Sequence, residues 1–309
     1  MEGIDVLIIG AGPAGLTAAI YAARSGLSTT ICDPGFPGGL ASTTASIENY
    51  PGFPEGIAGM DLGSRMFQQA TRFGASLANS RVERLWRDDA GIRAATGKAT
   101  LEARSAIVAT GSTPRKLGVP GEDKFGGRGV SYCATCDGPL YRDASVAVIG
   151  GGDSALQEAL FLAKFAAGVT VIHRRGELRA AAALQAEVRA NPRITLVLNK
   201  SIKAIEGGSL VEAVAVEDKA TSAAERIGVS GVFIYVGYDP NVSMLGPEFR
   251  LSGAGFLIAD ADMGTSVPGV FAAGDVRHKT LRQVATAVGD GAQAAMSAYA
   301  YLERLKKLA

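Results

Sequence analysis

The chain has 309 residues, of which 47% are hydrophobic and 20% are charged, so it is long enough for about two globular domains. Its 31 lysine and arginine residues nearly balance its 30 aspartate and glutamate residues, which argues against nucleic acid or an anionic membrane surface as a partner. The 40 glycines are about twice the usual share and suggest many tight turns or phosphate-binding loops.

Residues 6–23 carry no charge and approach the length of a membrane span. Gly10 and Pro13 interrupt this apolar run, and Asp5 precedes it where a signal peptide would have basic residues. We therefore expect neither export nor membrane insertion. The chain has three cysteines, so at least one must stay unpaired, which favours a reducing compartment and a cytoplasmic protein.

The segment 6–33 returns as a similar segment at 146–173, 140 residues later. Each copy begins with an apolar run typical of a strand and passes through a glycine cluster. A stretch with helical spacing and then a β-branched strand follow. The repeat predicts an α/β fold with two Rossmann-like, three-layer dinucleotide-binding domains.

The glycine clusters explain what the two repeats bind. Such a triplet allows a tight turn, lets a pyrophosphate approach the backbone, and packs the helix against the strand. The following helix directs its free N–H groups at the phosphates. The first copy has G-x-G-x-x-G at Gly10, Gly12 and Gly15, and the second has the variant G-x-G-x-x-A at Gly150, Gly152 and Ala155.

The two copies differ where their second strands end. Asp33 and His173 each lie 23 residues after the first glycine of their triplet. An acid at this position accepts the ribose hydroxyls and repels a 2′-phosphate, so Asp33 indicates the adenosine of FAD or NAD. In the second copy His173, Arg174, Arg175 and Arg179 offer donors for a 2′-phosphate, which indicates NADP. The alternative for this basic run is a solvated turn.

Strand-like segments mark where the chain leaves and re-enters the first domain. An apolar run ends at Thr110-Gly111, and another, within 230–241, ends before a Gly, Asp and Pro cluster. A third, within 268–275, precedes a helix rich in small residues. We expect one domain made of residues 1–113 and 242–309, with the other, residues 114–241, inserted in it.

The stretch SYCATCDGPLYR, residues 131–142, holds two of the three cysteines. A zinc knuckle needs four ligands, and too few cysteines and histidines remain, so we expect no metal. A structural disulfide would close too small a loop to restrain the unfolded chain much. Cys133 and Cys136 therefore indicate a redox dithiol. Asp137 would supply and remove protons; its alternative role is a helix N-cap.

The motifs GAGPAG, ENYPGF, ATG at 109–111, CATCDG, GGGDSA, HRRGELRA, GVFAAGD and RQVATA occur in this order along the chain. In order and spacing the sequence resembles the low-molecular-weight, bacterial-type thioredoxin reductases over essentially its whole length. The resemblance implies a homodimer that passes electrons from NADPH through FAD and the Cys133/Cys136 dithiol to thioredoxin or a thioredoxin-like protein. FAD would bind the first domain and NADPH the inserted one, which in this family rotates to alternate nicotinamide and dithiol at the flavin.

The resemblance also implies site residues, and Cys136 would be the sulfur nearer the flavin. The FAD-binding residues would be Gly10, Gly12, Pro13, Ala14, Gly15, Asp33, Gly38, Gly39, Leu40, Asn49, Thr110, Gly111, Gly274, Asp275, Arg282, Gln283 and Val284. The NADPH-binding residues would be Gly150, Gly152, Asp153, Ser154, Ala155, His173, Arg174, Arg175 and Arg179. Two departures stand out: Leu40 replaces the family's usual glutamine, and Glu177 lies within the basic cluster.

Two other functions remain open from the sequence. A related flavin enzyme could take electrons from another donor such as ferredoxin, or reduce a disulfide other than that of thioredoxin. A redox sensor with little turnover would use the cysteines as a switch. The intact basic cluster at His173 speaks against another donor, and reduction of thioredoxin by NADPH distinguishes all three.

Overall fold

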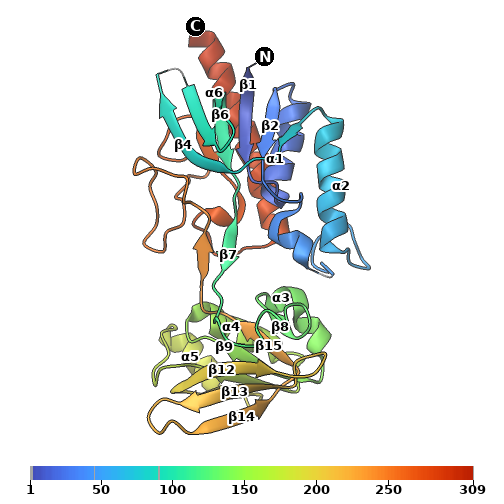
Figure 1. Ribbon diagram of the computed structural model, residues 1–309, viewed down its shortest axis with the longest axis vertical. Coiled ribbons are helices and arrows are strands. Elements are labelled where there is room, and N and C mark those ends of the chain that lie inside the picture. The colour runs from blue at the N-terminus through green and yellow to red at the C-terminus, as the bar shows by residue number, and fades with distance from the viewer. Residues whose placement is uncertain (1–2, 45, 90, 309) are drawn as a thin grey trace. The chain divides into compact units, whose positions relative to one another are not determined.

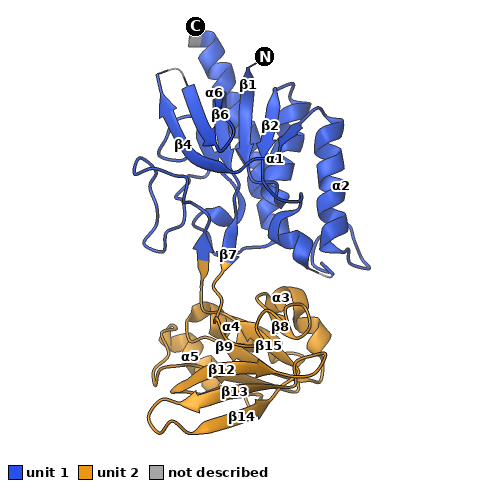
Figure 2. Cartoon of the chain, in the orientation of Figure 1, with its two compact units in different colours: residues 1–113, 239–309 blue, residues 114–238 orange. Residues whose placement is uncertain are grey.

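The computed structural model describes residues 3–44, 46–89 and 91–308. The chain divides into two compact units (Figure 2). We call residues 1–113 and 239–309 the terminal unit, and residues 114–238 the inserted unit. Each unit contains its own buried apolar clusters, so each has a core of its own.

The terminal unit contains, in its described part, a seven-stranded sheet of order β3-β2-β1-β6-β5-β4, with β17 also paired to β6 (Figure 1). Strands β1, β2, β3, β6 and β17 are parallel, whereas β4 and β5 are antiparallel to their neighbours. The long strand β6 pairs with two strands along the same edge. Its residues 100–103 pair with β5, and its residues 106–108 pair with β17. The bounds are β1 Ile4–Ile9, β2 Thr29–Cys32, β3 Ser76–Ala78, β4 Val82–Asp88, β5 Gly91–Thr96, β6 Thr100–Val108 and β17 Val270–Ala272.

Successive side chains of β1 contribute alternately to the two apolar cores of the terminal unit. Val6 and Ile8 belong to the cluster that includes the helices, and Leu7 and Ile9 belong to the cluster on the other face. Side chains alternate between the faces of a strand, so a continuous apolar run is expected where both faces are covered. The helices and 3₁₀ turns of this unit are α1 Pro13–Arg24, α2 Gly59–Arg72, α6 Val284–Leu308, η1 Gly39–Thr43 and η3 Gly274–Val276.

Small residues let α1 and α6 pack closely. A Cβ placed on Gly291 of α6 would fall onto the backbone carbonyl of Ala14 in α1. Ala18 on α1 and Ala294 and Ala298 on α6 are fully buried. This contact explains the small-residue helix noted in the sequence, and it positions the first glycine turn beside the C-terminal helix.

The inserted unit contains a five-stranded parallel sheet of order β11-β10-β9-β15-β8. A separate three-stranded antiparallel sheet, β12-β13-β14, belongs to the same unit. The strands are β8 Val130–Ser131, β9 Ser145–Ile149, β10 Gly168–Ile172, β11 Ile194–Val197, β12 Lys200–Glu206, β13 Ala213–Asp218, β14 Ala224–Gly228 and β15 Gly231–Ile234. The helices and 3₁₀ turn are α3 Ala134–Asp137, α4 Asp153–Leu162, α5 Ala182–Ala190 and η2 Gly138–Tyr141.

The sequence repeat is also a structural repeat. The order β1-α1-β2 recurs as β9-α4-β10, and the ends of the first strands, the starts of the helices and the ends of the second strands are each 140 residues apart. Both copies lie in parallel sheets. The α/β fold with two Rossmann-like units is thereby confirmed.

The two crossover segments pair with each other. Strand β7 (Ser112–Pro114) and strand β16 (Tyr238–Pro240) form a two-stranded sheet. The N–H of Arg115 donates to the carbonyl of Gly237 at 2.9 Å, next to this pair.

Within the residues that the structure describes, no helix is long and apolar enough to cross a membrane.

Candidate active site

The first glycine turn leaves its backbone open to a ligand. A Cβ on Gly15 would collide with the carbonyl of Gly10, so the turn and the start of α1 are in direct contact. A Cβ on Gly12, by contrast, would come no closer than 3.9 Å to the Cα of Gly39. The N-terminus of α1, which begins at Pro13, follows at once. This open backbone at a helix N-terminus suits a diphosphate.

Asp33 ties the end of β2 to this turn. Its Oδ2 accepts the N–H of Ala11 at 2.7 Å, and its Oδ1 accepts the N–H of Gly35 at 2.7 Å. The carboxylate is therefore held in one orientation beside the glycine turn. Since each carboxylate oxygen has a second lone pair, Asp33 still has capacity to accept the hydroxyls of a ribose.

The segment Gly38-Gly39-Leu40 lies against the same turn. The N–H of Gly38 donates to the carbonyl of Ala11 at 2.8 Å, and a Cβ on Gly39 would approach the Cα of Gly12 to 2.9 Å. The side chain of Leu40 is 55% exposed. The close approach is a backbone contact, so the leucine that replaces the family's glutamine leaves it intact.

The turn Gly274-Asp275 packs against α1 from the other end of the chain. A Cβ on Gly274 would lie 2.8 Å from the Cβ of Ala14. Oδ1 of Asp275 is buried and has no hydrogen-bond partner among the described residues. Burial raises the pKa of Asp275, although the nearby charges of Lys279 and Arg282 lower it. Lys279 Nζ lies 3.8 Å from this oxygen, within ion-pair distance, so Oδ1 still lacks a hydrogen bond, which the sugar hydroxyls of a bound cofactor would supply.

Asp290 supports this turn, and no sequence motif predicts this role. Its carboxylate accepts the N–H of Gly274 at 3.1 Å. It also pairs with Arg277 at 2.8 Å and Lys279 at 2.9 Å. Asp290 lies on α6, between the last predicted motif and the C-terminus, in a stretch rich in small residues.

Six further sequence-predicted positions lie in the terminal unit. Asn49 donates to the side chain of Gln283 at 3.0 Å, although 234 residues separate them. The guanidinium of Arg282 lies 4.1 Å from the ring centroid of Phe256, and Val284 begins α6. Thr110 and Asn241 exchange two hydrogen bonds, of 2.7 and 2.9 Å, and Gly111 follows with φ +69°.

The second glycine turn is also built for close approach. A Cβ on Gly150 would come within 2.7 Å of the Cβ of Ala155, while a Cβ on Gly152 would meet nothing within 4 Å. Asp153 accepts the N–H of Ala181 at 2.8 Å, and Ser154 is exposed at the start of α4. The open position at Gly152 therefore matches that of Gly12 in the first turn.

His173 and its arginines flank this second turn. The imidazole is 6% exposed, its Nε2 has no hydrogen-bond partner among the described residues, and a Cβ on Gly151 would strike its ring. Burial, and then the charges of Arg179, Arg175 and Arg174, lower the pKa of His173. The N–H of Arg179 donates to the carbonyl of Gly151 at 2.7 Å.

The three arginine side chains and that of Glu177 are exposed. In the described part of the chain none of these arginines forms a salt bridge. An exposed guanidinium cluster next to a glycine turn suits a phosphate group.

Cys133 and Cys136 form a disulfide across the start of α3, with Cα atoms 5.3 Å apart. Oδ2 of Asp137 accepts the hydroxyl of Ser131 at 2.5 Å, and the Ser131 hydroxyl accepts the N–H of Cys133 at 3.1 Å. Burial raises the pKa of Asp137, and the hydrogen bond from Ser131 lowers it by less. This carboxyl can therefore hold a proton at a higher pH than an ordinary aspartate.

Asp137 precedes the 3₁₀ turn η2 but makes no side-chain capping hydrogen bond there. The capping role is therefore absent from this conformation. Ser131 is not among the residues predicted from the sequence, although its position two residues before Cys133 is a signal for it. Within the described residues, no group of three or more histidine, cysteine, aspartate or glutamate side chains could hold a metal ion.

Cys32, the remaining cysteine, is a buried free thiol at the end of β2. Burial, and to a smaller extent the charge of Asp33, raise its pKa to about 11. A neutral, buried thiol reacts slowly with alkylating reagents. We therefore expect N-ethylmaleimide at neutral pH to label no thiol rapidly in the native oxidised protein, and two after reduction with NADPH; rapid labelling of Cys32, read by mass spectrometry, would contradict this.

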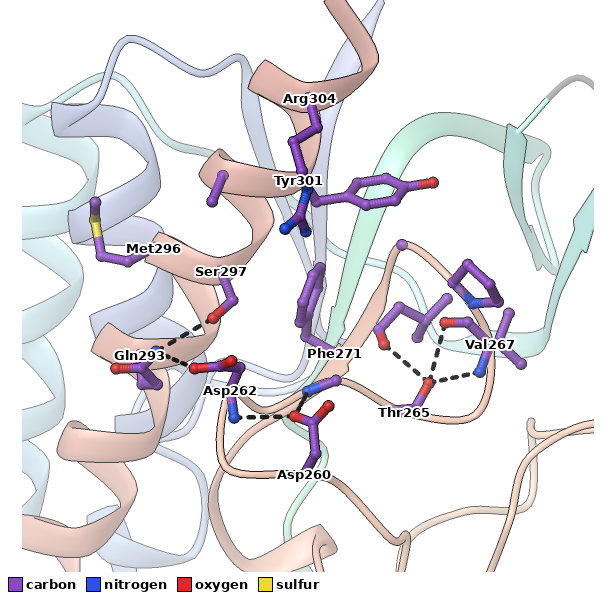
Figure 3. Close-up of a pocket in the computed structure, with 15 residues that line it drawn as sticks. Asp260, Asp262, Thr265, Val267, Phe271, Gln293, Met296, Ser297, Tyr301 and Arg304 are labelled. Carbon is purple, nitrogen blue, oxygen red and sulfur yellow. Dashed lines mark hydrogen bonds between the residues drawn. The ribbon is translucent and has the colours of Figure 1, made fainter. Parts of the chain in front are cut away.

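A surface cavity of about 440 Å³ lies in the terminal unit, between α6 and the loop 260–271 (Figure 3). None of its lining residues is a sequence-predicted site residue. Gln293 lies between Asp262 and Ser297 and contacts both, and the carboxylate of Asp260 accepts the N–H groups of its own loop. The polar groups here hold the loop in place.

Comparison with known proteins adds three findings. The family model described as "Pyridine nucleotide-disulphide oxidoreductase" matches residues 4–291. The thioredoxin reductases of Treponema pallidum (strain Nichols) and Bacillus subtilis (strain 168) are each 43% identical to this chain; the alignments cover 98% of this chain and 98% and 96% of theirs. The crystal structure of thioredoxin reductase from Streptococcus pyogenes MGAS5005 matches with a TM-score of 0.92 at 45% identity, covering 97% of this chain and 98% of that one.

Proposed function

The chain belongs to the pyridine nucleotide-disulphide oxidoreductase family, among its thioredoxin reductases, and on this premise we propose that it reduces the disulfide of thioredoxin with electrons from NADPH. The observation that carries the proposal is the Cys133–Cys136 disulfide beside the half-buried carboxyl of Asp137. When bound, NADPH supplies a hydride and FAD passes the electron pair on to the disulfide. The balance is one NADPH, one proton and one disulfide giving NADP⁺ and a dithiol.

We assign FAD to the terminal unit. The open backbone at Gly12 would hold the diphosphate, Asp33 the adenosine ribose, and the buried Oδ1 of Asp275 a sugar hydroxyl. The backbone of Gly39 and the pair of Asn49 and Gln283 would border the same cofactor. The support is the unsatisfied polar atom at Asp275 together with the closeness of Gly274 to α1.

We assign NADPH to the inserted unit. Gly152 would admit the diphosphate at the N-terminus of α4. His173, with Arg174, Arg175 and Arg179, would hold the 2′-phosphate. Because burial and the arginine charges lower the pKa of His173, its imidazole is neutral at pH 7 and binds as a hydrogen-bonding group, while the arginines supply the charge.

The basic cluster leads to a specificity prediction. Arg174→Ala combined with Arg175→Ala should lower kcat/KM for NADPH by roughly 100-fold, because hydrogen bonds to charged groups are lost. The value for NADH should stay within about twofold. Arg142→Ala, an exposed arginine elsewhere in the inserted unit, is the control. Equal efficiency of the unaltered protein with both nucleotides would rule out the assignment.

The chain's own residues handle the protons of disulfide reduction. Asp137 is placed to protonate and deprotonate a cysteine sulfur, and Ser131 orients its carboxyl. By resemblance, Cys136 would be the sulfur nearer the flavin. The direct test is anaerobic titration of the purified protein with NADPH, followed by oxidised thioredoxin. A colourless protein that cannot be reconstituted with FAD would contradict the proposal.

We further propose a homodimer that works in a reducing compartment such as the cytoplasm. The exposed apolar side chains of Phe36 and Met60 on the terminal unit support self-association, and the free thiol of Cys32 supports a reducing environment. Sedimentation equilibrium of the purified protein tests the dimer, and a single species of 31.7 kDa would contradict it.

A further inference from the structure

A buried glutamate of the inserted unit anchors the residue before the disulfide. Glu122 is 3% exposed, and its Oε1 accepts the hydroxyl of Tyr132 at 2.7 Å. The same carboxylate accepts the N–H of Leu117 at 2.9 Å and the N–H of Gly118 at 2.7 Å. A buried carboxylate is costly unless it is hydrogen-bonded, so the two backbone donors hold Glu122 in place, and Glu122 in turn fixes Tyr132 next to Cys133.

Two more tyrosines hold the peptide groups on either side of Cys133. The hydroxyl of Tyr238 donates to the carbonyl of Tyr132 at 2.8 Å. The hydroxyl of Tyr235 accepts the N–H of Ala134. Both tyrosines come from one short segment that follows β15, more than 100 residues away from the cysteine along the chain. The backbone before and after Cys133 is therefore held by the same segment.

These contacts link the disulfide to both crossover segments. Leu117 and Gly118 follow β7, and Tyr238 is the first residue of β16, its pairing partner. The position of the Cys133 backbone is thus tied to the two places where the inserted unit joins the rest of the chain. The segment that follows β15 also lies near the second glycine turn, because a Cβ on Gly150 would approach the carbonyl of Tyr235 to 2.5 Å.

We propose that Tyr132, Tyr235 and Tyr238, together with Glu122, are positioning residues for the redox disulfide. The inference rests on the proposed function, in which the dithiol reduces a second disulfide. In that exchange one thiolate attacks the substrate, a mixed disulfide forms, and the remaining thiol attacks it and releases a reduced substrate. Holding the backbone at Cys133 keeps the two sulfurs within reach of each other, which raises their effective concentration.

The test is removal of two hydroxyl groups by Tyr235→Phe with Tyr238→Phe. At a fixed ratio of reduced to oxidised dithiothreitol, we expect the equilibrium between disulfide and dithiol to shift toward dithiol by about 3- to 10-fold for each hydrogen bond lost. Alkylation and mass spectrometry measure the two forms. Tyr141→Phe is the matched control, because in the described structure its hydroxyl makes no hydrogen bond and its ring packs on Phe233.

The same variants separate positioning from general loosening of the fold. Reduction of the bound flavin by NADPH should stay within about twofold, while thioredoxin reduction falls by a factor similar to the equilibrium shift. The proposal would be overturned if the equilibrium shift were no larger than that of Tyr141→Phe. It would also be overturned if the rate of flavin reduction fell as much as the rate of thioredoxin reduction and the melting temperature fell with them. Tyr238→Phe alone repeats the test with a milder change. If the unaltered protein fails to reduce thioredoxin, the proposed function falls, but the dithiothreitol equilibrium still decides the positioning role.

Discussion

Replacing Cys136 with serine should lower the rate of thioredoxin reduction by on the order of 1,000-fold or more. A single remaining thiol cannot form the disulfide that Cys133 and Cys136 make in the structure, so no electron pair can be stored between flavin and substrate. The reduction of bound flavin by NADPH should be nearly unchanged. Stopped-flow absorbance of the flavin and a steady-state thioredoxin assay measure the two steps separately.

Cys32→Ser provides the matched control for this experiment, since Cys32 is buried and unpaired in the terminal unit. It should retain thioredoxin reduction within a few-fold. Undiminished turnover by the Cys136 variant would mean that the disulfide has no part in the reaction. The hypothesis that the CxxC segment is a redox dithiol would then be wrong.

Asp137→Asn should slow disulfide turnover by roughly 100-fold, because a positioned acid or base contributes about this much or more. Asparagine keeps the size of the side chain but cannot carry the proton. Flavin reduction by NADPH should persist. Asp143→Asn makes the same change at an exposed position of the inserted unit and should leave turnover unaffected. If both variants reduced disulfide at the same rate, Asp137 would have no role in proton transfer.

The pH dependence of this effect has a definite sign. Burial raises the pKa of Asp137, so the carboxyl keeps its proton to a higher pH than an unfolded aspartate does. Protonation therefore favours the folded state: stability declines as the pH rises from the unfolded pKa to the raised folded one. Steps that need the protonated acid should slow as the pH rises through the raised folded pKa. The asparagine variant should lack both the kinetic limb and this part of the stability profile.

The two repeats could be predicted from the sequence because the residues that define each one lie close together in the chain. The strand, glycine turn and helix of each repeat follow one another within about 30 residues, and each element uses its own periodicity. The positions of Asp33 and His173 beside their glycine turns follow from the same short segments. The family resemblance, the α/β class and the identity of the enzyme are confirmed by the comparisons.

The supporting contacts were out of reach of the sequence for a physical reason. Tyr132 and Tyr238 are 106 residues apart, and Asn49 and Gln283 are 234 apart. No periodicity predicts which tyrosine hydroxyl meets which carbonyl once two sheets and their loops have folded. The antiparallel sheet β12-β13-β14 was missed as well, because its strands alternate weakly and lie outside the repeat.

The pairing of β7 with β16 has a consequence for how such a protein can be assembled from parts. Residues 114–238 leave and rejoin the chain at neighbouring points, and they carry two apolar cores of their own. We therefore expect that the inserted unit can be expressed alone, or exchanged for that of another reductase, without changing the chain path of the terminal unit. Under the assignments proposed above, such an exchange would move the NADPH site and the Cys133–Cys136 disulfide together.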